Sequence, residues 1–181
     1  MEQFRGTCVV GFDIAGDAAG FPIDAHLKAF HYAREHHLPC TAHAGEARGP
    51  ESVWKTLQNF YPTRIGHGVR SIEDPALIEH LRRNNIHLEV CPTCNIQTDV
   101  YPVYESHSVD KLYHFGLSLN INTDTRTMTN ITLTQEYGKL NRVFGWEKEH
   151  FLHCNINALR AAFLPEHSRK ELMTRLVEGY Q

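Results

Sequence analysis

The chain has 181 residues, of which 41% are hydrophobic, and its formal net charge is −3. This length allows a single domain with a buried core, and the charge provides no basic field that would bind a nucleic acid. No apolar run reaches the roughly 20 residues of a membrane span, and the N-terminus lacks the apolar core of a signal peptide. We therefore expect a cytoplasmic protein with neither a nucleic acid nor a membrane as partner.

Short apolar runs alternate with amphipathic segments along the chain, which predicts strands that alternate with helices. The strands are predicted at Thr7–Phe12, Cys40–Ala44, Arg64–Gly68, Ile86–Cys91 and Leu117–Asn122. The helices are predicted at Pro22–His37, Pro50–Phe60, Asp74–Asn84, Val109–Phe115, Leu133–Phe144, Glu147–Ala161 and Glu166–Gly179. Pro92 ends the fourth strand, and a long loop that contains Pro102 is predicted after it.

Continuous apolar strands separated by helices are typical of a parallel sheet covered by helices, so the predicted fold class is α/β. In a (β/α)₈ (TIM) barrel the carboxyl ends of the strands share one face, where residues distant in sequence meet. A full barrel needs eight strand-helix units and about 250 residues. This chain supplies about five units, so we predict one incomplete TIM-barrel domain over residues 1–181. Polar residues follow the strands: Asp13 and Gly16, His43 and Glu46, His67, Asn95, and Asp124.

Three of these residues form a candidate metal site. His43, His67 and Asp124 offer two nitrogens and an oxygen, a set that binds zinc or positions a water on it. Glu46 follows His43 after a glycine that lets the backbone bend, and it is a candidate acid or base that does not bind the metal. The alternative is that each polar residue only ends its strand.

The five cysteines are odd in number and scattered, so free thiols are expected rather than a disulfide framework. Cys91 and Cys94 form a C-x-x-C pair, but the chain contains no second pair and no thioredoxin-like context. We therefore predict neither a zinc knuckle nor a redox centre from this pair.

Several motifs in one order extend over nearly the whole chain and resemble the adenosine deaminase family of the amidohydrolase superfamily. The motifs are Val9–Asp17, His43–Glu46, Arg64–Gly68, Leu88–Pro92, Asn122–Asp124 and Asn155–Ala158, followed by Phe163–Pro165. The resemblance implies Zn²⁺ as cofactor, with His43 and Asp124 as ligands. It also implies that Glu46 donates a proton to the purine ring and that His67 orients and stabilises the hydroxide.

The implied reaction is hydrolytic deamination of adenosine and deoxyadenosine to inosine or its deoxy form and ammonia, so a purine nucleoside is the expected partner. The resemblance places the backbone N–H of Gly16 against the purine. The family commonly has a second aspartate after the zinc-binding one, and here Thr125 occupies that position. A threonine can hydrogen-bond a ring nitrogen without adding charge. Adenine or another 6-aminopurine therefore stays open as an alternative substrate.

The family's opening strand carries a His-x-His pair that supplies two more zinc ligands, and no such pair occurs in the 181 residues. The chain resembles the portion from the fourth barrel strand to the C-terminus. We therefore expect association with the missing N-terminal segment, or self-association through the open edges of the barrel. The alternative of another class is a non-catalytic partial-barrel fragment or binding subunit.

Overall fold

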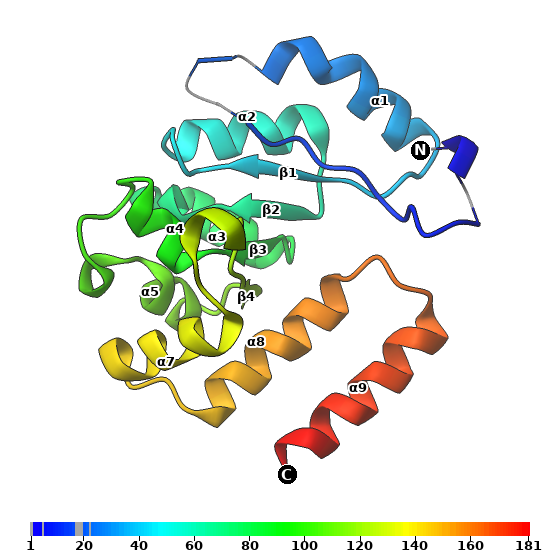
Figure 1. The fold of residues 1–181 in the computed structure, drawn as a ribbon. Helices are drawn as coiled ribbons and strands as arrows, with labels where there is room; N and C mark the ends of the chain where they lie inside the picture. The colour runs from blue at the N-terminus through cyan, green and yellow to red at the C-terminus, as the bar shows by residue number, and fades with distance from the viewer. Residues whose placement is uncertain (1, 5, 17–19, 22) are drawn as a thin grey trace.

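The computed structural model describes residues 2–4, 6–16, 20–21 and 23–181. Parallel strands form one sheet in the order β1-β2-β3-β4, and helices separate successive strands (Figure 1). The strands are β1 (Thr41–Ala44), β2 (Arg64–His67), β3 (His87–Val90) and β4 (Leu119–Ile121). Neighbouring parallel strands that follow one another in sequence are the arrangement of a segment of a (β/α)₈ barrel. The predicted α/β partial barrel is confirmed.

Helices cover the sheet and continue beyond β4, where α8 and α9 lie side by side (Figure 1). Across the described part of the chain, no helix combines the length and the apolar character needed to cross a membrane. The α-helices are α1 (Leu27–Glu35), α2 (Pro50–Phe60), α3 (Pro75–Arg83), α4 (Pro92–Gln97), α5 (Val109–His114), α6 (Arg126–Thr129), α7 (Leu133–Phe144), α8 (Lys148–Ala161) and α9 (Glu166–Tyr180). Short 3₁₀ helices are η1 (Glu2–Phe4), η2 (Ile23–His26), η3 (Val69–Glu73) and η4 (Tyr104–Ser106).

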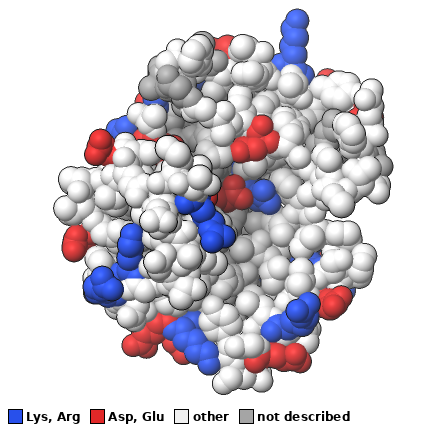
Figure 2. Space-filling view, in the orientation of Figure 1, with Lys and Arg blue, Asp and Glu red and all other residues white. Residues whose placement is uncertain are grey.

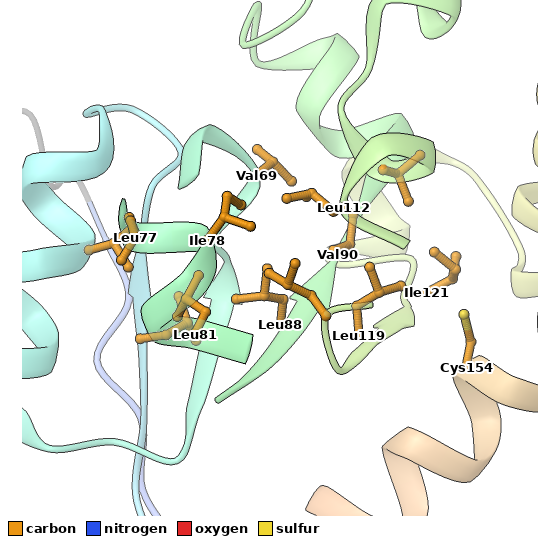
Figure 3. Packing of buried hydrophobic residues seen from close by; sticks show 14 of the residues in the cluster. Val69, Leu77, Ile78, Leu81, Leu88, Val90, Leu112, Leu119, Ile121 and Cys154 are labelled. Carbon is orange, nitrogen blue, oxygen red and sulfur yellow. The ribbon is translucent and has the colours of Figure 1, made fainter. Parts of the chain in front are cut away.

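One face of the sheet is apolar and packs against the helices. Ile65, Leu88 and Leu119 are paired with one another across β2, β3 and β4, and all are fully buried. Leu77 and Leu81 of α3 reach this face from the helix layer, and all five side chains belong to one core cluster (Figure 3). Because successive side chains of a strand point to opposite faces, the residues before and after each of these apolar ones point to the other face of the sheet.

The opposite face of the sheet is polar. Arg64 and Glu89 form an ion pair there, with 3.1 Å between Nε and Oε1, and Thr41 donates to Glu89 Oε2 at 3.2 Å. Acidic and basic side chains also lie together at the bottom of a hollow in the molecular surface (Figure 2). The sheet thus directs its charged side chains away from the apolar core and toward the side on which a barrel interior would lie.

Buried His87 on this polar face makes the stability of the fold sensitive to acid. Its Nδ1 lies 2.8 Å from Ser118 Oγ, and its Nε2 lies 3.1 Å from Asn120 Oδ1. Burial, assisted by the charge of Arg64, lowers the pKa of His87 from 6.5 to about 4, although the Asn120 hydrogen bond acts in the opposite direction. The unfolded chain therefore takes up this proton at a higher pH than the folded chain does.

Because of this difference, the free energy of unfolding should fall as the pH falls from 6.5 toward 4. Between pH 7 and pH 5, we expect His87 alone to account for a loss of roughly 2 kcal/mol. Urea unfolding of the parent chain and of His87→Gln at both pH values measures this loss. The variant should lose less stability on acidification, and equal acid sensitivity of the two proteins would contradict the assignment.

The predicted buried strand at Thr7–Phe12 is wrong. Within Thr7–Phe12, a stretch that the structure describes in full, only Phe12 pairs with the sheet, through an isolated parallel bridge to Cys40, and the backbone N–H of Thr41 donates to its carbonyl. Val9 and Val10 are 42% and 51% exposed. The reason is the position of β1: the chain comes alongside it only from Phe12 onward, so the two valines have no strand residues beside them.

The loop predicted after Pro92 is also wrong at its start, because α4 begins at Pro92 itself. Proline is tolerated in the first turn of a helix, where its missing N–H would have no intrahelical partner. The other predicted helices are present, and α2 and α7 match the prediction at both ends. The helix predicted over Pro22–His37 is a 3₁₀ helix over Ile23–His26 followed by α1, and its predicted first residue lies outside the described residues. The five cysteines are free thiols, as predicted.

Candidate functional site

The candidate site lies at the carboxyl ends of the strands and begins with His43 on β1. The Nδ1 atom of His43 lies 2.9 Å from Asp13 Oδ2, and the hydrogen bond to Asp13 raises the pKa of His43. A Cβ atom at Gly66 of β2 would lie 2.9 Å from the imidazole, so glycine at this position leaves room for the ring. Histidines that bind metals usually give their other ring N–H to a carboxylate or carbonyl. The contact with Asp13 therefore leaves the Nε2 side of His43 suited to a metal.

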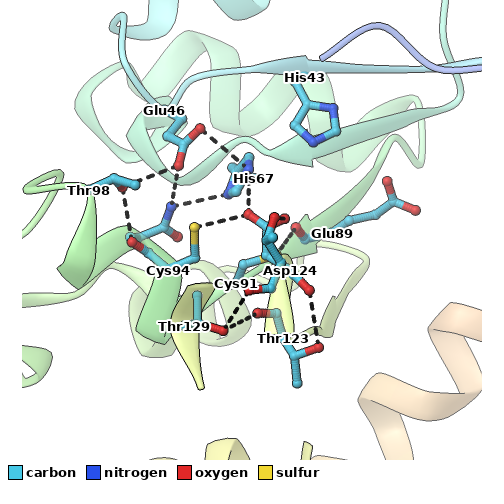
Figure 4. A network of polar contacts seen from close by, with 12 residues as sticks. His43, Glu46, His67, Glu89, Cys91, Cys94, Thr98, Thr123, Asp124 and Thr129 are labelled. Carbon is cyan, nitrogen blue, oxygen red and sulfur yellow. Dashed lines mark hydrogen bonds and ion pairs between the residues drawn. The ribbon is translucent and has the colours of Figure 1, made fainter. Parts of the chain in front are cut away.

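His67 is the last residue of β2 and joins the two acidic side chains of the site. Its side chain is 3% exposed, and its Nε2 lies 3.4 Å from Glu46 Oε2 and 3.7 Å from Asp124 Oδ2 (Figure 4). Burial lowers the pKa of His67, although the charge of Glu46 acts in the opposite direction. The ring of His67 is also 5.2 Å from that of His43, measured between centroids. The structure thus brings together the four residues predicted from the strand ends.

Asp124 follows β4 and is held by two short-range contacts. Its Oδ2 accepts a hydrogen bond from Cys94 Sγ at 2.9 Å, and its Oδ1 accepts one from Thr125 Oγ1 at 3.2 Å. Burial raises the pKa of Asp124, but the Cys94 hydrogen bond and the neighbouring His67 outweigh it, so that the pKa lies below its usual value. This carboxylate is therefore kept in its charged form.

Two of the site residues have backbone conformations that non-glycine residues rarely adopt. The φ angle is 61° at His67 and 55° at Asp124, both in the left-handed region. Such a conformation costs about 1–3 kcal/mol per residue, and residues strained in this way cluster at functional sites. Both residues stand at the point where the chain leaves a strand, and the turned backbone directs their side chains into the same space.

Glu46 reaches this space from the turn after β1. Gly45 precedes it with a φ of 69°, the conformation that allows the predicted bend. Glu46 Oε1 accepts hydrogen bonds from Asn95 Nδ2 and Thr98 Oγ1, each at 3.3 Å. The side chain is 25% exposed. It is therefore held by two donors and still accessible to a small molecule.

The donor atoms of the site are of the types that bind zinc. One nitrogen of His67, the sulfur of Cys91 and one oxygen of Asp124 all lie within 4.8 Å of one another. Imidazole nitrogens, thiolate sulfurs and carboxylate oxygens are the ligands found in protein zinc sites. Burial raises the pKa of the Cys91 thiol, so this residue stays protonated at neutral pH. The imidazole of His67 and the carboxylate of Asp124, in contrast, need lose no proton to face a metal at that pH.

A buried carboxyl group on α7 anchors the helix that contacts both acidic residues. Glu136 is fully buried; its Oε1 accepts the backbone N–H of Thr93 at 3.1 Å, and its Oε2 accepts the hydroxyl of Tyr104 at 2.5 Å. Thr93 lies in the first turn of α4, so Glu136 supplies a hydrogen-bond acceptor to the amino end of this helix. This contact fixes the position of α4 and of the site residues on it.

Replacement of Glu136 by Ala should lower the free energy of unfolding by about 2 to 4 kcal/mol, because it leaves two donors without a partner. Glu136→Gln is the matched control, since it keeps the shape and one oxygen and should lose less stability. Urea unfolding of the three proteins measures the difference. A loss within about 0.5 kcal/mol for Glu136→Ala, as for an ordinary surface substitution, would contradict the anchoring role.

Two predicted site residues lie at the margin of this arrangement. Gly16 is exposed, with a φ of 146°, and the hydroxyl of Thr125 is donated to Asp124. Sequence reasoning missed the contacts that Cys94 and Thr98 make with the acidic residues. Cys94 lies on α4 and Thr98 is the residue that follows its last turn, so recognition of Pro92 as a helix start could have placed them one turn apart beside the site.

Comparisons with known proteins show the family of the chain. Residues 1–179 match the family model described as adenosine deaminase. The adenosine deaminase of Klebsiella pneumoniae (strain 342) is 35% identical over 171 residues, which are 94% of this chain and 51% of that protein. The chain thus spans about half the length of the curated relatives it matches.

Solved structures share the same fold. Arabidopsis ADAL complexed with IMP matches with a TM-score of 0.89 at 26% identity, over 99% of this chain and 52% of that one. An amidohydrolase from Burkholderia ambifaria with bound Zn matches with a TM-score of 0.90 at 21% identity, over 99% of this chain and 50% of the other. At the latter identity the likeness concerns the fold alone.

Proposed function

Because the chain belongs to the adenosine deaminase family, we propose that the protein carrying it hydrolyses the 6-amino group of adenosine and deoxyadenosine. The observation that carries this proposal is the position of His67 Nε2, 3.4 Å from Glu46 and 3.7 Å from Asp124 at the carboxyl ends of parallel strands. An imidazole and two carboxyl groups around one space can orient a water, accept its proton and deliver a proton to a substrate.

We propose zinc as the metal of this site, with His43 and Asp124 as ligands. Asp124 belongs to a group of zinc-type donor atoms with His67 and Cys91, which supports zinc. The carboxylate partner on the far nitrogen of His43 supports the role of that residue. When bound, zinc lowers the pKa of water toward neutrality and so supplies a nucleophile. The family resemblance assigns two more ligands to a His-x-His pair, and we propose that a segment other than residues 1–181 provides it.

The residues of the chain then take separate roles in the proposed reaction. His67 orients the oxygen that bonds to C6 of the purine, and Glu46 gives a proton to a ring nitrogen as this bond forms. The C6–N bond then breaks: the amino group takes one hydrogen of the added water and leaves as ammonia, and the other hydrogen of that water restores the proton on Glu46. The 6-oxopurine product keeps the proton that Glu46 gave to its ring nitrogen. Asn95 and Thr98 hold the carboxyl group of Glu46 in place. We place the backbone N–H of Gly16 against the purine.

An assay of ammonia release from adenosine tests this function. It should be performed on the 181-residue chain alone and after mixing with the part of the Klebsiella relative that this chain does not cover. We expect zinc binding and turnover in the mixture, because it completes both the barrel and the ligand set, with residues 1–181 acting as one domain of the assembly. A folded, zinc-loaded complex that binds adenosine without turnover would favour the non-catalytic alternative.

A second candidate substrate is another 6-aminopurine, such as adenine or AMP. Thr125 adds no charge to the site, and its hydroxyl proton is already donated to Asp124. The Arabidopsis structure holds IMP, a 6-oxopurine nucleotide. Comparison of kcat/KM for adenosine, deoxyadenosine, adenine and AMP separates the candidates, and we expect the two nucleosides to give the highest values. The cytoplasmic location stays a prediction from the sequence.

A further inference from the structure

A row of buried polar groups leads from the start of α5 to the catalytic space. His107 precedes α5 and is 2% exposed, and Asn95 on α4 is fully buried. Because both side chains are buried, a substrate in the space between Glu46 and Asp124 would not contact them directly. Their hydrogen bonds, however, end on Nδ1 of His67, the nitrogen that faces away from that space.

The first link of the row is fixed by a backbone amide. The N–H of Val109 donates to Nδ1 of His107 at 3.0 Å, and an amide N–H can only donate. A neutral imidazole that accepts at Nδ1 carries its proton on Nε2. Burial lowers the pKa of His107 to about 3, so the ring is neutral at physiological pH. His107 therefore donates from Nε2 to Asn95 Oδ1, which lies 3.2 Å away.

The orientation of the Asn95 amide is fixed from both ends. Its Oδ1 faces the N–H of His107, so its Nδ2 must face the other way. There, Nδ2 lies 3.3 Å from Glu46 Oε1 and 3.1 Å from His67 Nδ1. Glu46 Oε1 also accepts the hydroxyl of Thr98, so this oxygen acts as an acceptor and favours the NH₂ group on this side as well. The second hydrogen of Nδ2 is then directed at His67 Nδ1.

We propose that His107 and Asn95 are positioning residues that fix His67 as the tautomer with its proton on Nε2. Since Nδ1 of His67 accepts from Asn95, the ring presents an N–H donor to the space between Glu46 and Asp124. The functional part of this inference rests on the proposed deaminase activity, because an N–H at this point can hold the oxygen that adds to the purine. The structural part does not depend on that activity.

The tautomer is measured directly by nitrogen-15 NMR of histidine-labelled protein, in which the two ring nitrogens give different correlation patterns for the two tautomers. The signal of His67 is assigned by its loss in His67→Gln. We expect the Nε2–H pattern for the parent chain. A clear Nδ1–H pattern in the parent protein would overturn the proposal.

Asn95→Asp is the decisive variant, because it replaces the NH₂ donor by an oxygen of the same size. His67 should then move its proton to Nδ1 and show the opposite pattern. Asn120→Asp is the matched control: Asn120 already presents Oδ1 to a second buried imidazole, that of His87, so the same substitution should leave His67 unchanged. An unchanged His67 pattern in folded Asn95→Asp would contradict the proposal.

A second pair of variants tests the far end of the row and covers the case in which Asn95→Asp does not fold. His107→Gln retains a donor for Asn95 Oδ1 and should preserve the Nε2–H pattern. His107→Leu leaves the amide of Asn95 held at the Glu46 end alone and should give a mixture with the Nδ1–H pattern. Equal patterns in both would overturn the role of His107. In the active assembly, His107→Leu should lower kcat by about 10- to 100-fold, with little change in KM and in bound zinc, as is typical for residues that orient a catalytic group. The NMR result stands even if no turnover is found, so the two proposals can fail separately.

Discussion

Replacing Glu46 with Gln should lower the rate of adenosine deamination by about 10² to 10⁴, the usual contribution of a general acid or base. Gln keeps the size of the side chain and an oxygen for Asn95 and Thr98, but it cannot deliver a proton. Zinc content should stay the same, because Glu46 is not one of the proposed ligands. The measurement is kcat for adenosine together with elemental analysis of the same preparation.

Glu73→Gln is a suitable control for this substitution. Glu73 is an exposed carboxylate paired with Arg70 in η3, and it lies outside the proposed site. The same chemical change there should leave kcat within a few-fold of the parent value, as expected of an ordinary surface substitution. A Glu46→Gln protein with near-parental turnover would show that the proton comes from another group.

Removal of the proposed ligands should separate metal binding from the orienting role of His67. Loss of a residue that only supports a metal ligand typically weakens metal binding by about 10- to 100-fold. His43→Ala and Asp124→Asn should weaken zinc binding by more than this, because each removes a proposed ligand. Asn is the better replacement for Asp124 because it tolerates the left-handed backbone found there. The zinc affinity is measured by dialysing each protein against a series of chelator concentrations and determining its remaining zinc by elemental analysis.

His67→Asn should retain most of the zinc and still lose most of the activity, since His67 acts on the oxygen rather than on the metal. Cys91→Ser should retain both, although its sulfur lies within 4.8 Å of donor atoms of His67 and Asp124. Equal zinc loss in His43→Ala, Asp124→Asn and His67→Asn would make His67 a ligand. Zinc loss in Cys91→Ser would place the thiol in the ligand set.

The parts of the fold that sequence predicts well are those with local signals. Helix α2 begins with Pro50 in its first turn, and α7 begins with a capping box between Thr132 and Gln135, so both are recognisable from a few neighbouring residues. The strands of the sheet are likewise recognisable from the sequence, because each is a short apolar run. These elements also deliver His43, His67 and Asp124 to one edge of the sheet.

The parts that sequence does not predict depend on contacts between distant residues. Helix α4 has six residues and no apolar stripe, and the acceptor at its amino end is Glu136, 43 positions away from Thr93. In the row that leads to His67, Asn95 is hydrogen-bonded to His107, which lies 12 positions further along the chain. Asparagine and histidine are common in loops, so their presence in the sequence does not indicate this contact. A pattern of residue types cannot reveal such pairs, because their geometry exists only after the chain has folded.

The central claim, that this site hydrolyses a 6-aminopurine nucleoside, is tested most directly by the mass of the product formed from adenosine in oxygen-18-labelled water. The complex of the 181-residue chain with the complementary segment should yield inosine that carries one labelled oxygen at C6 and an equal amount of ammonia, and the same complex with Glu46→Gln should yield almost none. Adenosine that stays intact in a folded, zinc-loaded complex would contradict the account, and so would labelled inosine formed at the same rate by both proteins.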